Sequence, residues 1–274
     1  PPRSTLFPYT TLFRSEDKAW LMALVARLYY IEDQNQETIA HKLNFSRASI
    51  SRLLKEAREH GIVDIRINYP WQRVPELETE LCDKFHLPAA SVLSCQLDQG
   101  DLVVTGLGVL AARYLLEILK PHTSLTIGTG VGVYQTVKAM PMREDLGITV
   151  IQMMGVVGTT NPQFDGAELA RQMAVRLGGT YHYIQAPLLV ENPAIGKALS
   201  SSQAIKPVLE LARTAQVGLV GVGSLHPESS NLLQAGLIKR ELLSELVGLG
   251  AAGIMCGKPY GRYGEPIQTN MNDM

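Results

Sequence analysis

The sequence predicts an α/β protein in two parts, and three observations support that prediction. Residues 34–69 have the pattern of two short helices, a tight turn and a trailing strand. Beyond Ala90, apolar strands alternate with amphipathic helices, which is typical of a mostly parallel sheet. Glycine-rich turns follow several of those strands. We therefore expect a helical module over 16–70, a linker helix over 71–88 and a Rossmann-like, mostly parallel α/β domain over 89–274.

Composition limits the classes of protein that the chain can belong to. Its 274 residues and 30.0 kDa suffice for a small module and one sizeable core. A net charge of -1 gives no global basic field, so any nucleic-acid binding must come from a local patch. Cys82, Cys95 and Cys256 have no metal or disulfide spacing, and we expect small buried residues in a reducing cytosol. Without a membrane-spanning run or a signal peptide, the predicted location is cytoplasmic.

The first fifteen residues, PPRSTLFPYTTLFRS, differ from the rest of the chain. They lack periodicity and caps, and they resemble the translation of a sequencing adapter. We expect residues 1–15 to be an artefactual leader, and the natural chain to start near Glu16. A helix over 17–31 should then pack across the next two helices and complete a three-helix core. Its predicted apolar face comprises Trp20, Leu21, Leu24, Val25 and Leu28, with Tyr29 and Tyr30 finishing the core.

Two capped helices follow. Asn35 is expected to cap a helix that ends at Leu43, and Ser46 a second helix that ends before Gly61. Only Asn44 and Phe45 separate them, which is too short for a free loop. The inward residues recur at helical spacing. They are Ile39, Ala40 and Leu43 on the first helix, and Ile50, Leu53, Leu54 and Ala57 on the second.

The opposite face of the second helix predicts DNA binding. At about 100° per residue, a small residue, a hydroxyl and two cations point away from the apolar stripe. Arg52 could read a guanine edge, while Lys55, Arg58 and Lys42 could serve phosphates. The alternative is an ordinary helix pair with a solvated basic face. The predicted DNA-binding residues are Ser46, Arg47, Ala48, Ser51, Arg52 and Lys55.

The segment after the second helix predicts a wing. Ile62, Ile65 and Ile67 alternate with Asp64 and Arg66, as in a half-buried strand. The module is therefore predicted to be a winged helix-turn-helix. A short amphipathic helix over 75–88 then aligns three apolar residues, and it could be a linker or part of a dimer seam. Those residues are Leu77, Leu81 and Phe85.

The predicted α/β domain alternates its elements regularly. Its candidate strands are 91–93, 124–127, 149–153, 180–184, 217–222 and 253–256. Its candidate helices are 102–119, 131–139, 167–177, 205–214 and 239–246. In such folds ligands bind beyond the carboxyl ends of the strands, so those ends are the places to look for a site.

Glycines cluster at four of those ends, within 128–132, 155–158, 221–223 and at Gly257. Glycine-rich strand-to-helix turns expose backbone N–H groups to an anion, and Thr129 would add a hydroxyl donor. We therefore predict a site for a phosphorylated small molecule, against the alternative of purely structural turns. The dinucleotide and P-loop spacings are absent, so no cofactor is expected.

Candidate catalytic residues are few. His122, His182 and His226 lie near element ends, and no metal or nucleophile-elbow spacing occurs. Asp165 and Glu168 are better placed to cap the helix that follows them. We therefore predict neither a catalytic residue nor a metal ligand, and we rank ligand sensing above catalysis.

The order of parts resembles that of the SorC/DeoR-type sugar-binding transcriptional regulators of bacteria. The resemblance runs from about residue 18 to the end, and includes IGTGVGVYQTV, MMGVVG, VGLVGVGS and GAAGIMCGKPYGRYGEPI. It implies an oligomeric regulator, a dimer or a tetramer, with a sugar-phosphate isomerase-like domain. It places the phosphate on Gly128, Thr129, Gly130 and Val131, and further pocket lining on Gly155, Gly221 and Gly223. Ile254 stands where the family usually has an acidic residue.

The resemblance also leads us to expect that the chain is C-terminally truncated, because the family continues beyond the point that Met274 matches. The predicted function is a regulator whose affinity for operator DNA is controlled by a phosphorylated sugar. Two alternatives stay open. One is a sugar-phosphate isomerase or deaminase-like enzyme with an accessory DNA-binding module; the other is a DNA-binding protein whose α/β domain only mediates assembly.

Overall fold

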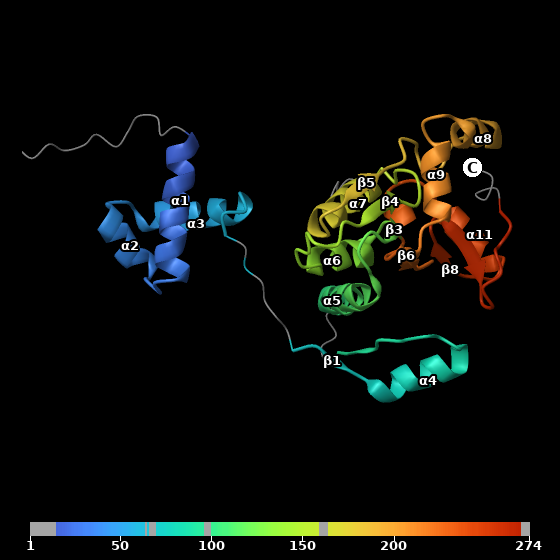
Figure 1. The fold of residues 1–274 in the computed structure, drawn as a ribbon, viewed down its shortest axis with the longest axis horizontal. Coiled ribbons are helices and arrows are strands. Elements are labelled where there is room, and N and C mark those ends of the chain that lie inside the picture. The colour runs from blue at the N-terminus through green and yellow to red at the C-terminus, as the bar shows by residue number, and fades with distance from the viewer. Residues whose placement is uncertain (1–14, 64, 66–69, 96–99, 159–163, 270–274) are drawn as a thin grey trace, which may run out of the picture. The chain divides into compact units, whose positions relative to one another are not determined.

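The protein forms two compact units, one up to Tyr69 and one from Pro70. Figure 1 draws the first unit in blue. The structure is a computed structural model that describes residues 15–63, 65, 70–95, 100–158 and 164–269. Among these residues, no helix is both long and apolar enough to cross a membrane.

Three helices build the first unit: α1 (Ser15–Tyr30), α2 (Gln36–Leu43) and α3 (Arg47–Glu59). Both predicted caps are confirmed. Asn35 accepts a hydrogen bond from the Thr38 N–H at 2.9 Å, and Ser46 accepts one from the Ser49 N–H at 3.1 Å. Each cap satisfies a backbone donor that the first helical turn leaves without a partner.

The core of this unit has the predicted inward residues of α2 and α3 at its centre, with Ile39, Ile50 and Ala57 fully buried. The predicted apolar face of α1 is partly wrong, because Trp20 is 73% exposed. The buried residues of α1 follow helical spacing without it, so Trp20 falls on the outer face. They are Met22, Val25, Ala26 and Leu28.

Two of the boundary predictions concern the ends of this unit. Helix α1 already includes Ser15, the last residue of the expected leader, whereas residues 1–14 lie outside the described part. Ile62 and Val63 pack on the core, and the Ile62 N–H donates to the Ala57 carbonyl at 2.9 Å. Residues 64 and 66–69 of the expected wing also lie outside the described residues, so the wing stays a prediction.

The second unit begins with a short antiparallel ribbon. Strands β1 (Gln72–Arg73) and β2 (Leu93–Ser94) pair with each other and flank α4 (Pro75–Phe85). The predicted strand at 91–93 is therefore wrong as a member of the parallel sheet. A Cβ on Gly106 would lie 2.6 Å from Leu93 and 2.9 Å from Trp71, so the ribbon packs closely on the helix that holds Gly106.

A parallel sheet of four strands, in the order β5-β4-β3-β6, forms the centre of this unit. Its strands are β3 (Ser124–Ile127), β4 (Thr149–Gln152), β5 (Thr180–His182) and β6 (Val217–Leu219). The positions of β3, β4 and β5 confirm three of the six predicted strands, and β6 is the first half of a fourth. The two central strands are almost entirely buried, as parallel strands covered on both faces usually are.

Helices cover the sheet where the sequence predicts them. They are α5 (Gly100–Ile118), α6 (Val131–Ala139), α7 (Gly166–Arg176) and α9 (Lys206–Arg213). Residues of α5, α6 and α7 share one buried cluster with Leu125, Ile127 and Val150 of the strands. Figure 1 shows α9 across the sheet from α6 and α7. Helix α8 (Pro193–Ser201), capped by Asn192, was not predicted.

A second sheet is antiparallel, in the order β7-β8-β9. It contains β7 (Val222–Gly223), β8 (Ala251–Met255) and β9 (Lys258–Gly261), beside α10 (Asn231–Gln234) and α11 (Arg240–Gly248). Two predictions are corrected here. The strand expected over 217–222 is divided between the two sheets, as β6 and β7. The strand expected over 253–256 forms an antiparallel hairpin, because it pairs with the segment that directly follows it.

Candidate effector site and DNA-binding surface

The outer face of α3 presents every residue predicted to contact DNA. Ser46, Arg47, Ala48, Ser51, Arg52 and Lys55 are all exposed. The Ser46 hydroxyl is engaged as the helix cap, so its first role is structural. Below this face Ile50, Leu53 and Leu54 anchor the helix in the core. The apolar side of α3 therefore fixes the direction in which its polar side points.

Charge on this face is only partly neutralised. Lys55 and Glu59, one turn apart on α3, form an ion pair at 3.7 Å. Both side chains are exposed, so the pair contributes little to stability. Glu56 pairs with Lys18 of α1 at 2.8 Å, and this hydrogen bond lowers the pKa of the Glu56 carboxyl. Arg47 and Arg52 form no ion pair within the described residues, so both guanidinium groups are available to phosphates or base edges.

The turn after β3 leads directly into the N-terminus of α6 at the carboxyl edge of the parallel sheet. Gly130 precedes α6 with φ 117, a conformation that side chains rarely adopt, and no side chain caps the helix. The first turn contains no acidic residue. Its N–H groups and the positive end of the helix dipole therefore favour an anion.

Two predicted donors of this turn are already engaged. The Gly128 N–H donates to the Leu219 carbonyl at 2.9 Å, which extends the pairing of β3 with β6. The Thr129 hydroxyl donates to the Phe164 carbonyl. The Thr129 hydroxyl proton is therefore engaged in this structure, its role toward a phosphate stays a prediction, and the first turn of α6 offers further N–H donors.

Neighbouring segments meet this turn at the carboxyl edge of the sheet. A Cβ on Gly221 would lie 3.8 Å from the Thr129 carbonyl oxygen and 3.9 Å from the Val133 side chain. The Cys256 thiol lies 3.1 Å from the Met153 sulfur, just beyond β4. The structure thus places Gly221 beside the predicted phosphate-binding turn, which consists of Gly128, Thr129, Gly130 and Val131.

The other predicted glycines have packing reasons of their own. A Cβ on Gly155 would lie 2.5 Å from the Pro187 carbonyl oxygen, and one on Gly223 3.2 Å from the Ile254 carbonyl oxygen. At both positions another backbone segment comes so close that glycine is favoured. The fourth cluster is not a strand-to-helix turn: Cys256 and Gly257, with φ 52 and 76, form the two-residue turn of the β8–β9 hairpin. Thr159 and Thr160, after the second cluster, lie outside the described residues.

Gln152 is a residue that the sequence reading missed. It ends β4 and is fully buried, and its Oε1 atom accepts a hydrogen bond from the Ile184 N–H at 2.9 Å. Its Nε2 atom has no hydrogen-bond partner among the described residues. The available signal was an amide that interrupts an otherwise apolar strand end, VIQMM.

The candidate acid residues behave as structural groups. Asp165 caps α7 by accepting from the Ala167 N–H at 2.8 Å, as predicted. Glu168 pairs with Arg171 at 2.7 Å, and this contact lowers the pKa of the Glu168 carboxyl. Within the part of the chain that the structure describes, no group of three His, Cys, Asp or Glu side chains is arranged to hold a metal ion.

The cysteines are less buried than expected. Cys95 is exposed, whereas Cys82 and Cys256 are half-buried. Burial raises the pKa of the Cys256 thiol, so the thiol form dominates at neutral pH.

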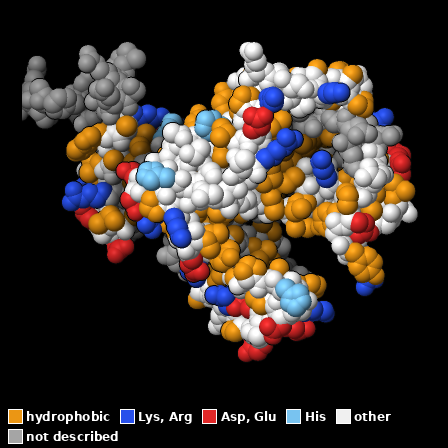
Figure 2. All heavy atoms as spheres, turned by 45° about the vertical axis from the view of Figure 1, so that its right-hand side comes forward, with side chains coloured by type: hydrophobic (Ala, Val, Ile, Leu, Met, Phe, Trp, Pro, Cys, Tyr) orange, Lys and Arg blue, Asp and Glu red, His pale blue; other side chains and the backbone are white. Residues whose placement is uncertain are grey.

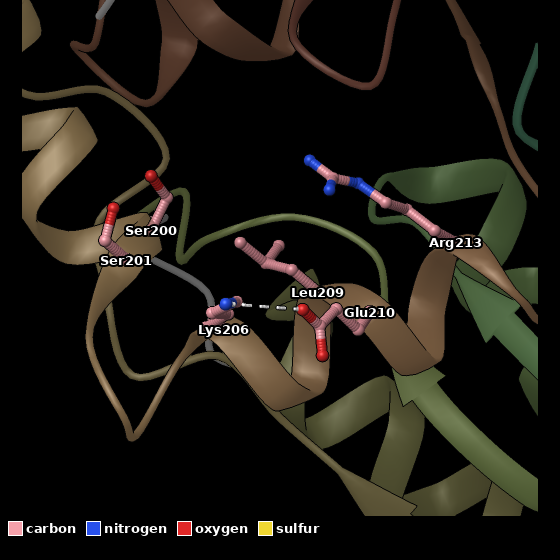
Figure 3. A pocket seen from close by; sticks show the side chains of 6 residues that line it. All are labelled: Ser200, Ser201, Lys206, Leu209, Glu210 and Arg213. Carbon is pink, nitrogen blue, oxygen red and sulfur yellow. Dashed lines mark ion pairs between the residues drawn. The ribbon is translucent and has the colours of Figure 1, made fainter.

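A surface depression lies elsewhere, between α8 and α9 (Figure 3). It has a volume of about 260 Å³ and is lined by Ser200, Ser201, Lys206, Leu209, Glu210 and Arg213. Lys206 and Glu210, one turn apart on α9, form an ion pair along one side of it at 3.8 Å. None of the predicted effector-binding residues lines this depression.

Known proteins resemble this chain in sequence and in fold. The family model Sugar-bind, described as "Putative sugar-binding domain", matches residues 69–274. The sorbitol operon regulator of Klebsiella pneumoniae is 30% identical over 261 residues, covering 94% of this chain and 82% of that protein. The chain belongs to the SorC/DeoR-type family of sugar-binding transcriptional regulators.

Two further comparisons agree with this membership. The deoxyribonucleoside regulator of Bacillus subtilis (strain 168) is 26% identical over 257 residues, covering 94% of this chain and 82% of that protein. The crystal structure of the full-length sorbitol operon regulator SorC from Klebsiella pneumoniae superposes with a TM-score of 0.68. That comparison has 30% identity and covers 93% of this chain and 82% of the other. The SorC/DeoR-type relatives are named as regulators of transcription, not as enzymes.

Proposed function

We propose that this SorC/DeoR-type regulator binds operator DNA through the outer face of α3 and a phosphorylated sugar at the carboxyl edge of the parallel sheet. The bound sugar phosphate controls operator affinity. A recognition helix needs small and hydroxyl residues where its backbone approaches the major groove, and cations beyond them. Ala48 and Ser51, followed by Arg52 and Lys55, supply that order on an exposed surface.

The N-terminus of α6 is the observation on which the effector proposal rests. It follows β3 directly, has no side-chain cap and has no acidic residue in its first turn. A phosphate there would receive the N–H groups of Val131 and Gly132 and the favourable end of the helix dipole. Gly221 lies close enough to border the same site. Gly155 and Gly223, which pack against other backbone segments, would shape its remaining wall.

The regulator is proposed to act as a cytoplasmic homo-oligomer, a dimer or a tetramer. Two copies place two recognition helices on the two halves of a palindromic operator, and the spacing of the half-sites must match the geometry of the pair. A ligand that favours one arrangement of the pair therefore changes operator affinity. We propose that the chain has no enzymatic activity, in line with the names of its relatives.

A thermal-shift series tests the effector site. The full chain is heated with D-sorbitol 6-phosphate, 2-deoxy-D-ribose 5-phosphate and D-fructose 6-phosphate, each beside its unphosphorylated parent sugar. Binding to the folded state raises the melting temperature by mass action. A shift with a sugar phosphate and none with its parent supports an anion site. Equal shifts with both members of every pair, or no shift with any, would contradict the proposal.

A further inference from the structure

Gln152 carries a polar group that the proposed phosphate site does not use. The residue is 0% exposed, and its Oε1 atom is held by the Ile184 N–H at 2.9 Å. That bond fixes the orientation of the amide, because a backbone N–H requires an acceptor. The amide nitrogen therefore points the other way, where the part of the chain that the structure describes gives it no hydrogen-bond partner. Buried donors of this kind are rare, and each calls for an explanation.

The free amide nitrogen faces the start of α7. A Cβ built on Gly166, the first residue of that helix, would lie 3.0 Å from Nε2. The backbone of Gly166 does not have a positive φ, so its conformation does not demand glycine. The missing side chain lets the start of α7 pack directly against the amide. Helix N-termini offer further N–H donors, of which Asp165 engages that of Ala167.

We propose that Gln152 and the first turn of α7 form a second subsite of the effector pocket, which receives a neutral hydroxyl or carbonyl oxygen of the sugar. This inference rests on the proposed function, because it concerns the orientation of the same ligand. Gln152 would donate its amide hydrogen to that oxygen and so help to determine which sugar binds.

The charges at the two helix N-termini distinguish the two subsites. The first turn of α7 already holds Asp165 as its cap and Glu168, which Arg171 keeps ionised. Two carboxylates at this end repel a further anion but do not repel a neutral oxygen. The first turn of α6 has no acidic residue. The phosphate therefore belongs at α6 and the hydroxyl-bearing end of the ligand at α7.

The two subsites adjoin. Ile127, which precedes the α6 turn, pairs in register with Gln152. The Thr129 hydroxyl donates to the Phe164 carbonyl, two residues before Gly166. The Tyr134 and Phe164 rings also meet edge to face, with centroids 5.0 Å apart. The Nε2 atom itself is closed off from solvent, so a ligand oxygen reaches it only when the residues around Gly166 shift.

Titration calorimetry on the full chain tests the inference, with the three sugar phosphates named above and with inorganic phosphate. Gln152→Leu removes the amide, and we expect it to weaken sugar-phosphate binding about tenfold or more. Inorganic phosphate should bind as to the wild type, since it occupies only the α6 subsite. The matched control is Gln216→Leu, which also removes an amide oxygen from a backbone N–H, that of Ser124, at the other end of the sheet. This control should leave both affinities unchanged.

Gly166→Ala tests the same subsite if Gln152→Leu does not fold. Alanine suits a helix better than glycine, but its methyl group presses on a buried side chain, so this variant should stay folded and melt at a slightly lower temperature. The three atoms nearest to that methyl group all belong to the Gln152 side chain, and we expect weaker binding of the sugar phosphate. Unchanged binding in the folded variants would overturn the subsite alone. Failure of every sugar phosphate to bind the wild type would overturn the proposed effector as well.

Discussion

Gly130 holds the turn before α6 in a conformation that other residues avoid. At φ 117, Gly130→Ala is expected to lower the free energy of unfolding by about 1–3 kcal/mol. It should also weaken phosphate binding, because the first turn of α6 would lose its position. Urea denaturation and phosphate titration measure the two effects.

Gly132 is the matched control within the same turn. It has open space around its Cβ position and no positive φ. Gly132→Ala should therefore leave stability unchanged or raise it by up to about 1 kcal/mol. Equal losses of stability in the two variants would show that backbone strain at Gly130 is not what destabilises Gly130→Ala.

Arg52 is the residue expected to read a base. Arg52→Ala should weaken binding to an operator, selected from a random duplex library, by about 1–3 kcal/mol and relax its sequence preference. Arg27→Ala, on α1 and paired with Glu32, makes the same change in net charge within the same unit. Fluorescence anisotropy at fixed salt compares them, and an equal loss in both variants would argue against a specific role for Arg52.

Among the elements, α1 and α3 are joined by the Lys18–Glu56 ion pair. The hydrogen bond from Lys18 lowers the pKa of the Glu56 carboxyl in the folded state. A lowered pKa adds stability at neutral pH that is lost as the pH falls through the folded value. Glu56→Gln should therefore destabilise the protein at pH 7, and the difference should disappear in acid. A difference that stays constant across denaturation curves from pH 7 to acid would contradict this role.

Helix α4 exposes apolar side chains and buries none within its own chain. Leu77 and Phe85 are 46% and 58% exposed. We expect this face to contact another copy, so Phe85→Glu should lower the oligomeric mass measured by sedimentation velocity. Leu107→Glu, which also replaces an exposed apolar side chain but on α5, is the control. An unchanged mass in the Phe85 variant would remove α4 from the seam.

Local signals in the sequence predicted where helices and strands lie better than they predicted which strands pair. Asn35, Ser46 and Asp165 cap helices at the predicted positions because a cap depends on the next few residues only. Strand pairing depends on distant or competing segments. The 253–256 strand joins an antiparallel hairpin through its neighbour β9, and periodicity alone does not reveal that choice.

At the scale of the whole molecule, the candidate site was predictable only in part. The turn at Gly128 to Val131 was found because glycines after a strand are a recognisable pattern. The engagement of Thr129 by Phe164 could not be predicted, since 35 residues separate them in the chain. Gln152 was missed for a similar reason: one amide in an apolar strand gains meaning only from what lies around it.

The central claim is that a sugar phosphate bound to the second unit changes the affinity of the first unit for operator DNA. Its most direct test is the dissociation constant of the full chain for its selected operator, measured by anisotropy with and without the sugar phosphate that raises the melting temperature. Allosteric coupling of typical strength, about 1–3 kcal/mol, would change that constant between 5- and 150-fold. The parent sugar should have no effect. A sugar phosphate that binds and leaves the operator constant unchanged would contradict the account.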